Sequence, residues 1–224
     1  MYEKHNWTFN ANVVKVFDEH VRNSVPLYDL FQKEIASMSV YFSQHNSKII
    51  DIGTSTGSLI NLLVDYNSHR NVSFIGIDVE PDMVEECKTR YSEIKFQVLD
   101  AVECDYTNAS VVTSMLTLQF MEHFKRKEVL KRIYNQMNLN GALFIVEKVR
   151  SVDVEIHDIY SDLYYDFKRE NFSTTEILDK NQSLRGVMKP ITMNENIEML
   201  KSVGFKKVDI FMKINNFVGI LAIK

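Results

Sequence analysis

The chain contains few of the residues that cross-link a protein or interrupt its regular structure. Of its 224 residues, two are cysteine, three are proline and seven are glycine. Cys87 and Cys104 form no Cys-x-x-Cys motif, so we expect neither a disulfide framework nor a zinc site, and we predict no metal ion. So little proline and glycine leaves no linker, and a single domain is predicted.

The sequence also lacks long apolar runs and a strong charge. The apolar run at 217–223 is too short to cross a bilayer, and no apolar signal core follows Met1. We therefore expect a cytoplasmic protein without membrane contact. A net charge of −4 makes strong non-specific binding to nucleic acid unexpected, so we predict no direct nucleic-acid partner.

Strand and helix patterns alternate along the chain. Two helical stretches, 13–23 and 26–44, come before the first strand. Five strands are predicted at 48–52, 71–79, 94–100, 108–116 and 142–149, and helices follow the first, second and fourth of them. Helical stretches at 152–172, 175–187 and 193–203 then lead to two strands that meet at Asn215-Asn216. The pattern predicts an α/β fold with a doubly wound, mostly parallel seven-stranded sheet, an antiparallel C-terminal hairpin and extra N-terminal helices.

The most informative stretch is KIIDIGTSTGSLINLL, residues 48–63. In a doubly wound sheet, ligands bind at the carboxyl ends of the strands, where this strand hands over to a helix. Gly53 allows a tight turn, and Gly57 lets the helix start close to a ligand. The middle glycine of the pyrophosphate fingerprint is missing, which favours a ligand without phosphate such as S-adenosylmethionine (SAM). Asp51 suits the cationic ammonium and sulfonium groups of that ligand.

Two later strands also end in acids. Asp78 ends the second strand and can accept both hydroxyl groups of a ribose. Asp100 ends the third and is followed by Ala101, at a place where the adenine amino group would be recognised. Acids at three successive strand ends favour a SAM site over a nicotinamide site.

The chain resembles the carboxy-S-adenosylmethionine synthases, enzymes with the Rossmann-like class I methyltransferase fold, over nearly its whole length. The motifs that carry the resemblance are WTF (7–9), SVPLY (24–28), DIGTSTG (51–57), NAS (108–110), TLQF (117–120), NGAL (140–143), EK (147–148), DFKREN (166–171), GVM (186–188) and GF (204–205). The resemblance implies an enzyme that makes carboxy-SAM from SAM and prephenate, and a homodimer. It further implies that the ligand-binding positions include Tyr28, Gly53, Thr54, Ser55, Asp78, Asp100 and Ala101. Tyr28 would lie beside the sulfonium as a cation–π partner.

The chain departs from the family at three positions. Val79 and Met115 stand where the family has asparagine. Asn181 stands where a family arginine holds the transferred carboxylate, and a neutral amide cannot replace that guanidinium. Arg185 would share a helical face with Asn181, so it is a candidate substitute. We therefore predict Tyr28, Asn181 and Arg185 as catalytic candidates.

These departures leave alternatives open. One is SAM-dependent methyl transfer to another small acceptor, which depends mainly on holding a nucleophile in line with the methyl carbon. Another is attack within SAM itself, with release of methylthioadenosine. A ligand-binding protein without activity is the third.

The patterns suggest four segments within one SAM-binding domain, residues 1–224. They are an N-terminal helical cap (1–47), a nucleoside-binding core (48–149), a helical lid or substrate region (150–203) and the C-terminal hairpin (204–224). In the third segment, Tyr160, Tyr164 and Phe167 fall on one helical face. This face would either pack in the core or serve as a lid and a dimer contact.

Overall fold

The computed structural model describes residues 17–224. The WTF motif and the first part of the helix expected at 13–23 lie outside these residues. The strands are β1 (Lys48–Ile52), β2 (Ser73–Asp78), β3 (Lys95–Val98), β4 (Ala109–Met115), β5 (Ala142–Lys148), β6 (Lys207–Ile214) and β7 (Phe217–Ile223). The helices are α2 (Phe17–Ser24), α3 (Tyr28–Ser39), α4 (Ser58–Asn67), α5 (Pro81–Arg90), α6 (His123–Gln136), α7 (Val154–Arg169), α8 (Thr174–Ser183) and α9 (Met193–Val203), with a 3₁₀ turn η1 (Leu118–Phe120).

The strands form one seven-stranded sheet in the order β3-β2-β1-β4-β5-β7-β6. β1 to β5 run parallel, and β7 pairs antiparallel with both β5 and β6. The predicted doubly wound sheet with its C-terminal hairpin is therefore confirmed. Strand order reverses between β1 and β4, which places a ligand-binding crevice at the carboxyl ends of these two strands.

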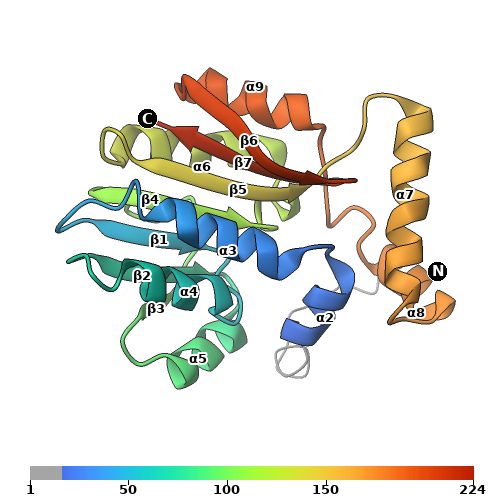
Figure 1. Cartoon of the computed structure of the whole chain (residues 1–224), viewed down its shortest axis with the longest axis horizontal. Helices are drawn as coiled ribbons and strands as arrows, with labels where there is room; N and C mark the ends of the chain where they lie inside the picture. The colour runs from blue at the N-terminus through green and yellow to red at the C-terminus, as the bar shows by residue number, and fades with distance from the viewer. Residues whose placement is uncertain (1–16) are drawn as a thin grey trace.

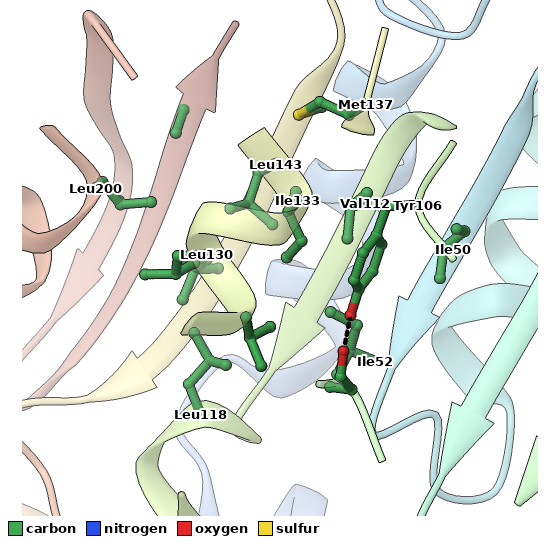
Figure 2. Close-up of a cluster of buried hydrophobic side chains, with 14 of the residues drawn as sticks. Ile50, Ile52, Tyr106, Val112, Leu118, Leu130, Ile133, Met137, Leu143 and Leu200 are labelled. Carbon is green, nitrogen blue, oxygen red and sulfur yellow. Dashed lines mark hydrogen bonds between the residues drawn. The ribbon is translucent and has the colours of Figure 1, made fainter. Parts of the chain in front are cut away.

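Helices cover both faces of the sheet (Figure 1). On one face, α2, α3 and α4 pack apolar side chains such as Phe31, Ile35 and Leu63 against β1, β4 and β5. On the other face, α6 and α9 enclose a second core (Figure 2). In that core the Tyr106 hydroxyl donates a hydrogen bond to the Ala101 carbonyl at 2.8 Å.

Two helices leave the sheet after β5. α7 stands beside the carboxyl end of the strands, and α8 follows it toward α2 (Figure 1). α7 begins at an Asp153 cap that accepts from the Ile156 N–H, and α8 begins at a capping box of Ser173 and Glu176. The helix expected at 175–187 is shorter because the chain leaves helical geometry before Gly186, whose φ is 73°. α9 packs against α6 and the hairpin.

Between residues 17 and 224, none of the helices is both long and apolar enough to cross a membrane.

Candidate functional site

A cavity of about 390 Å³ opens at the carboxyl ends of β1, β2, β4 and β5. α2 and α3 border it on one side, and α7, α8 and the segment after α8 border it on the other. The site predicted from strand-end residues therefore corresponds to a real hollow in the fold.

Asp51 lies deepest among the acids. It sits in β1, is 2% exposed, and accepts a hydrogen bond from the Thr113 hydroxyl of β4 at 2.6 Å. Burial raises the pKa of Asp51 to about 7, although the hydrogen bonds from Thr113 and Thr54 oppose the shift. Because a cation beside this carboxyl would favour its charged form, the position suits an ammonium group.

Asp78 lies at the end of β2, next to Asp51. Its two oxygens accept the backbone N–H groups of Ser55 at 2.9 Å and Glu80 at 3.0 Å. Burial raises the pKa of Asp78, and these backbone N–H groups hold it back. The bond to Ser55 fixes the loop after β1 against the end of β2, and the carboxyl lines the cavity as a hydrogen-bond acceptor.

Gly53 and Gly57, in the loop between β1 and α4, have different structural roles. Gly53 lines the cavity with φ 67°, and a Cβ there would come within 2.2 Å of the Thr117 hydroxyl. Gly57 does not line the cavity. Its φ is 80°, and a Cβ would press on the Tyr91 ring at 2.8 Å, so this glycine lets α4 pack against α5. That Gly57 brings the helix close to a ligand stays a prediction, and the structure gives this glycine a packing role.

Several other predicted residues line the same cavity: Tyr28, Thr54, Ser55, Val79, Met115 and Asn181. Burial raises the pKa of Tyr28 to about 12, so its ring stays neutral and offers an aromatic face. The Asn181 amide donates to the Tyr165 hydroxyl at 2.6 Å, which holds α8 to α7.

Besides Gly57, three further predicted residues do not line the cavity. Asp100 faces Lys125 at 3.6 Å, and Ala101 is buried with its carbonyl bound to Tyr106. Arg185 is exposed, in the turn after α8. These residues were expected at the cavity from their position in the chain alone. The path of the loop after β3 keeps Asp100 and Ala101 out of the cavity lining, and the end of α8 does the same for Arg185.

Sequence reasoning missed the three lysines that line the cavity. Lys148 ends β5, Lys168 lies in the last turn of α7, and Lys180 lies in α8. The Lys148 ammonium lies 3.9 Å from the centre of the Tyr164 ring. The only sequence signal was a lysine in each of three stretches: EK (147–148), DFKREN (166–171) and DKNQSLR (179–185). Nothing in the sequence shows that these three distant segments converge.

A buried acid, Glu147, and a buried arginine, Arg126, support the turn at the floor of the cavity. Glu147, 2% exposed, has its pKa raised to about 8 by burial, opposed by Arg126 and by the backbone N–H groups of residues 117–119. Arg126 in turn donates to the carbonyls of Gln119 and Met121. The TLQF and EK motifs thus meet in the structure, and they fix the turn that carries Thr117 to the cavity wall.

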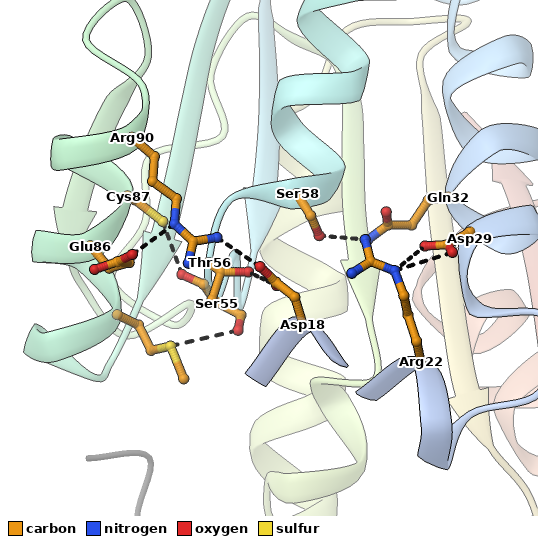
Figure 3. A network of polar contacts seen from close by, with 11 residues as sticks. Asp18, Arg22, Asp29, Gln32, Ser55, Thr56, Ser58, Glu86, Cys87 and Arg90 are labelled. Carbon is orange, nitrogen blue, oxygen red and sulfur yellow. Dashed lines mark hydrogen bonds and ion pairs between the residues drawn. The ribbon is translucent and has the colours of Figure 1, made fainter. Parts of the chain in front are cut away.

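α2 is joined to the loop after β1 by polar contacts (Figure 3). Asp18 accepts from the Thr56 hydroxyl and from Arg90 of α5, which also pairs with Glu86 at 2.7 Å. These contacts hold α2 over the cavity, so the N-terminal segment forms part of the site. Among residues 17–224, no cluster of histidine, cysteine and acidic side chains is arranged to hold a metal ion.

The sequence matches a family model described as a methyltransferase domain over residues 43–215. Solved structures with the same fold include human N-acetylserotonin methyltransferase in complex with SAM, at 17% identity and a TM-score of 0.58 over 95% of this chain and 53% of that one. Another is a SAM-dependent methyltransferase from Corynebacterium glutamicum, at 14% identity and a TM-score of 0.58 over 96% of this chain and 100% of that one.

Relatives named carboxy-S-adenosyl-L-methionine synthase match almost end to end. The protein of Staphylococcus epidermidis is 39% identical over 100% of this chain and 99% of its own length. The protein of Methylococcus capsulatus is 34% identical over 96% of this chain and 93% of its own length. The strand-end cavity, the motifs that build its floor and this full-length similarity lead to one conclusion: the chain belongs to the carboxy-S-adenosyl-L-methionine synthase family of enzymes, within the methyltransferase fold.

Proposed function

We propose that this protein converts SAM into carboxy-SAM with prephenate as the carboxyl donor. Full-length similarity to the synthases supports the reaction. The observation that carries the proposal is the pair of acids at adjacent strand ends in one cavity, the buried Asp51 and the half-buried Asp78. Their geometry suits a cationic nucleoside better than a phosphate-bearing one.

The acids and Tyr28 would hold SAM by different parts. Asp78 would accept the ribose hydroxyls, while Asp51 would pair with the ammonium group of the methionine part. The ring of Tyr28 would face the sulfonium, which an aromatic face attracts. Gly53 would let the backbone approach the methionine part, since no side chain intervenes there.

The reaction places a carboxyl group on the sulfonium methyl. The methyl carbon loses one proton and forms a bond to the carbon dioxide that leaves prephenate. That proton and the ring hydroxyl of prephenate leave as water, and the remaining ring becomes the aromatic ring of phenylpyruvate. The cavity has to hold both substrates at once, with the methyl carbon facing the donor.

Methyl transfer to a different small acceptor is the second candidate. It is favoured by the position of Asn181, which presents a neutral amide to the cavity, and of Arg185, which points away from it. Within the described part of the chain, no arginine lines the cavity. The absence of an arginine from the described cavity lining also favours cleavage within SAM, with release of methylthioadenosine.

Product analysis separates these reactions. The purified protein is incubated with SAM, with and without prephenate, and the adenosyl products are identified by mass spectrometry. We expect carboxy-SAM only when prephenate is present. Methylthioadenosine without any acceptor would instead indicate cleavage within SAM, and SAM binding without a product in either mixture would contradict the synthase proposal.

The proposal includes a cytoplasmic homodimer that acts on small molecules rather than directly on nucleic acid. Its support is the resemblance to the synthases and the acidic balance of the sequence, with a net charge of −4.

A further inference from the structure

Three lysines converge on the side of the cavity away from the acids. Lys148 comes from β5, Lys168 from α7 and Lys180 from α8. Lys168 is 5% exposed, and the other two are half-buried. Lysines are mostly exposed in folded proteins, so three lysines in one wall of a cavity need an explanation.

Aromatic rings lie close to the ammonium groups of Lys148 and Lys168, where carboxylates would be the usual neighbours. The Lys168 ammonium lies 5.5 Å from the centre of the Tyr164 ring and 5.8 Å from that of Phe172. Between residues 17 and 224, no carboxylate oxygen lies within 4 Å of the Lys148 or Lys168 ammonium groups. Cation–π contacts offset only part of the cost of burying such a charge.

The positive charges also act on one another. Burial, together with the charge of Lys168, lowers the pKa of Lys148 to about 8 and that of Lys180 to about 7. Within residues 17–224, two titratable groups also face this wall: His20 of α2, whose pKa burial and the charges of Lys180 and Lys168 lower to about 4, and Glu176 of α8. A bound anion would relieve this repulsion and keep the lysines protonated.

The sheet sets the distance between the two walls. The acids lie at the ends of β1 and β2, and Lys148 ends β5, two strands beyond β1 in the order of the sheet. Strands in a sheet lie about 4.8 Å apart, so the backbones at the ends of β1 and β5 are roughly 10 Å apart. That gap accommodates a cationic ligand on the acid side and an anionic one on the lysine side, with their reacting carbons between them.

We propose that Lys148, Lys168 and Lys180 form the binding site for the carboxylate groups of the co-substrate and do the work that an arginine at position 181 would do. The inference rests on the proposed function, because it assumes a carboxylate donor beside SAM. Lys180 precedes Asn181 in α8, so the positive charge is supplied from the same helix by its neighbour. Lys180 therefore takes the place of Arg185 as the candidate for this role, because Arg185 is exposed and does not line the cavity.

Titration calorimetry tests the site. Protein saturated with S-adenosylhomocysteine, which has no methyl group to react, is titrated with prephenate and, separately, with malonate. We expect Lys168→Met and Lys180→Met each to weaken anion binding by about tenfold or more, as expected for loss of a charge-assisted contact. Lys180→Arg should retain binding, since the positive charge is kept. Affinity for S-adenosylhomocysteine should change by less than about threefold, which also shows that the variants are folded.

The control is Lys127→Met, which removes an exposed lysine of α6 that does not line the cavity. It should bind both anions as the unaltered protein does. A second measurement uses the unaltered protein alone: anion binding at pH 8 should take up protons, detected as a difference in heat between two buffers of different ionisation enthalpy. A purely structural role for the lysines would give no such uptake.

The outcomes distinguish this inference from the proposed function. Unchanged anion affinity in both methionine variants, or no binding of either anion by the unaltered protein, overturns the lysine site. Carboxy-SAM formation with an unchanged KM for prephenate in both variants overturns it too, while the synthase function stands. Lysine-dependent binding of malonate without any carboxy-SAM product supports the anion site and contradicts the synthase function.

Discussion

At the scale of single residues, Asp51 has the most to gain from a bound ligand. It is 2% exposed, and its hydrogen bonds come from neutral hydroxyl groups, that of Thr113 above all. A cation in the cavity would give this carboxyl a charged partner. We therefore predict that Asp51→Asn, which keeps the shape of the side chain, weakens SAM binding by about ten- to a hundredfold, because a charge-assisted contact contributes about 1.5–3 kcal/mol.

Calorimetry of SAM with Asp51→Asn measures that loss. Asp105→Asn is a suitable control, since Asp105 is an exposed acid that pairs with Lys48 at the opposite end of β1. Equal affinity of the Asp51 variant and the unaltered protein would remove Asp51 from the ligand site.

The raised pKa of Asp51 also predicts a pH dependence. Its value of about 7 in the fold lies above the ordinary 3.8, so between these values the folded state binds more protons than the unfolded one. This group therefore contributes stability that is complete below about pH 3.8 and is lost as pH rises through 7. SAM needs the charged form, so its affinity should fall on the order of tenfold between pH 7.5 and 5.5.

Asp51→Asn isolates this titration from those of Asp78 and Glu147, whose pKa values are raised as well. The fall in affinity and the difference in unfolding midpoint across this pH range should both be smaller in the variant. Identical pH profiles for the two proteins would contradict the assignment.

At the scale of elements, α2 completes the site through a side chain at its start. Asp18 connects this helix to Thr56 in the loop after β1 and to Arg90 of α5. The ion pair is about 28–29% exposed on each side, so solvent screening limits its contribution to at most about 1 kcal/mol. Asp18→Asn should therefore leave the fold intact and weaken SAM binding by a few fold, because α2 is less firmly held over the cavity.

Calorimetry and hydrogen exchange of α2 test the prediction together. Glu19→Gln, an exposed change in the same helix, serves as the control. Faster exchange in α2 without a change in SAM affinity would show that this helix is not part of the binding site.

At the scale of the whole molecule, α7 presents an apolar face to the outside. Ile156, Ile159 and Leu163 are 45%, 50% and 46% exposed and share one side of the helix. The helix stands at the edge of the molecule beside the sheet, where a second copy has access to it (Figure 1). We predict a homodimer through this face, so Leu163→Glu should shift the protein toward the monomer.

Light scattering coupled to size-exclusion chromatography measures the molar mass of the protein in solution and so distinguishes dimer from monomer. Leu139→Glu alters an apolar residue that is 73% exposed in the loop between α6 and β5, and it should leave the dimer intact. A monomeric unaltered protein would contradict the prediction, and a dimer unaffected by Leu163→Glu would place the interface elsewhere.

The sequence by itself determined the order of the elements, the parallel sheet with its C-terminal hairpin, and the loop of small residues after β1. These features follow from local patterns: apolar runs of strand length, and glycines at turns of positive φ such as Gly53. The same patterns placed Asp51 and Asp78 at strand ends, and parallel strands bring such ends together at one edge of a sheet.

Only the tertiary structure decided which side chains enter the cavity. It directed Asp100 toward Lys125 and left Arg185 exposed, because loop paths after a strand or helix depend on distant contacts. It also brought Lys148, Lys168 and Lys180 into one wall, although each is an ordinary lysine in its own segment. Their significance comes from shared burial and mutual repulsion, and these exist only once β5, α7 and α8 have packed around the same space.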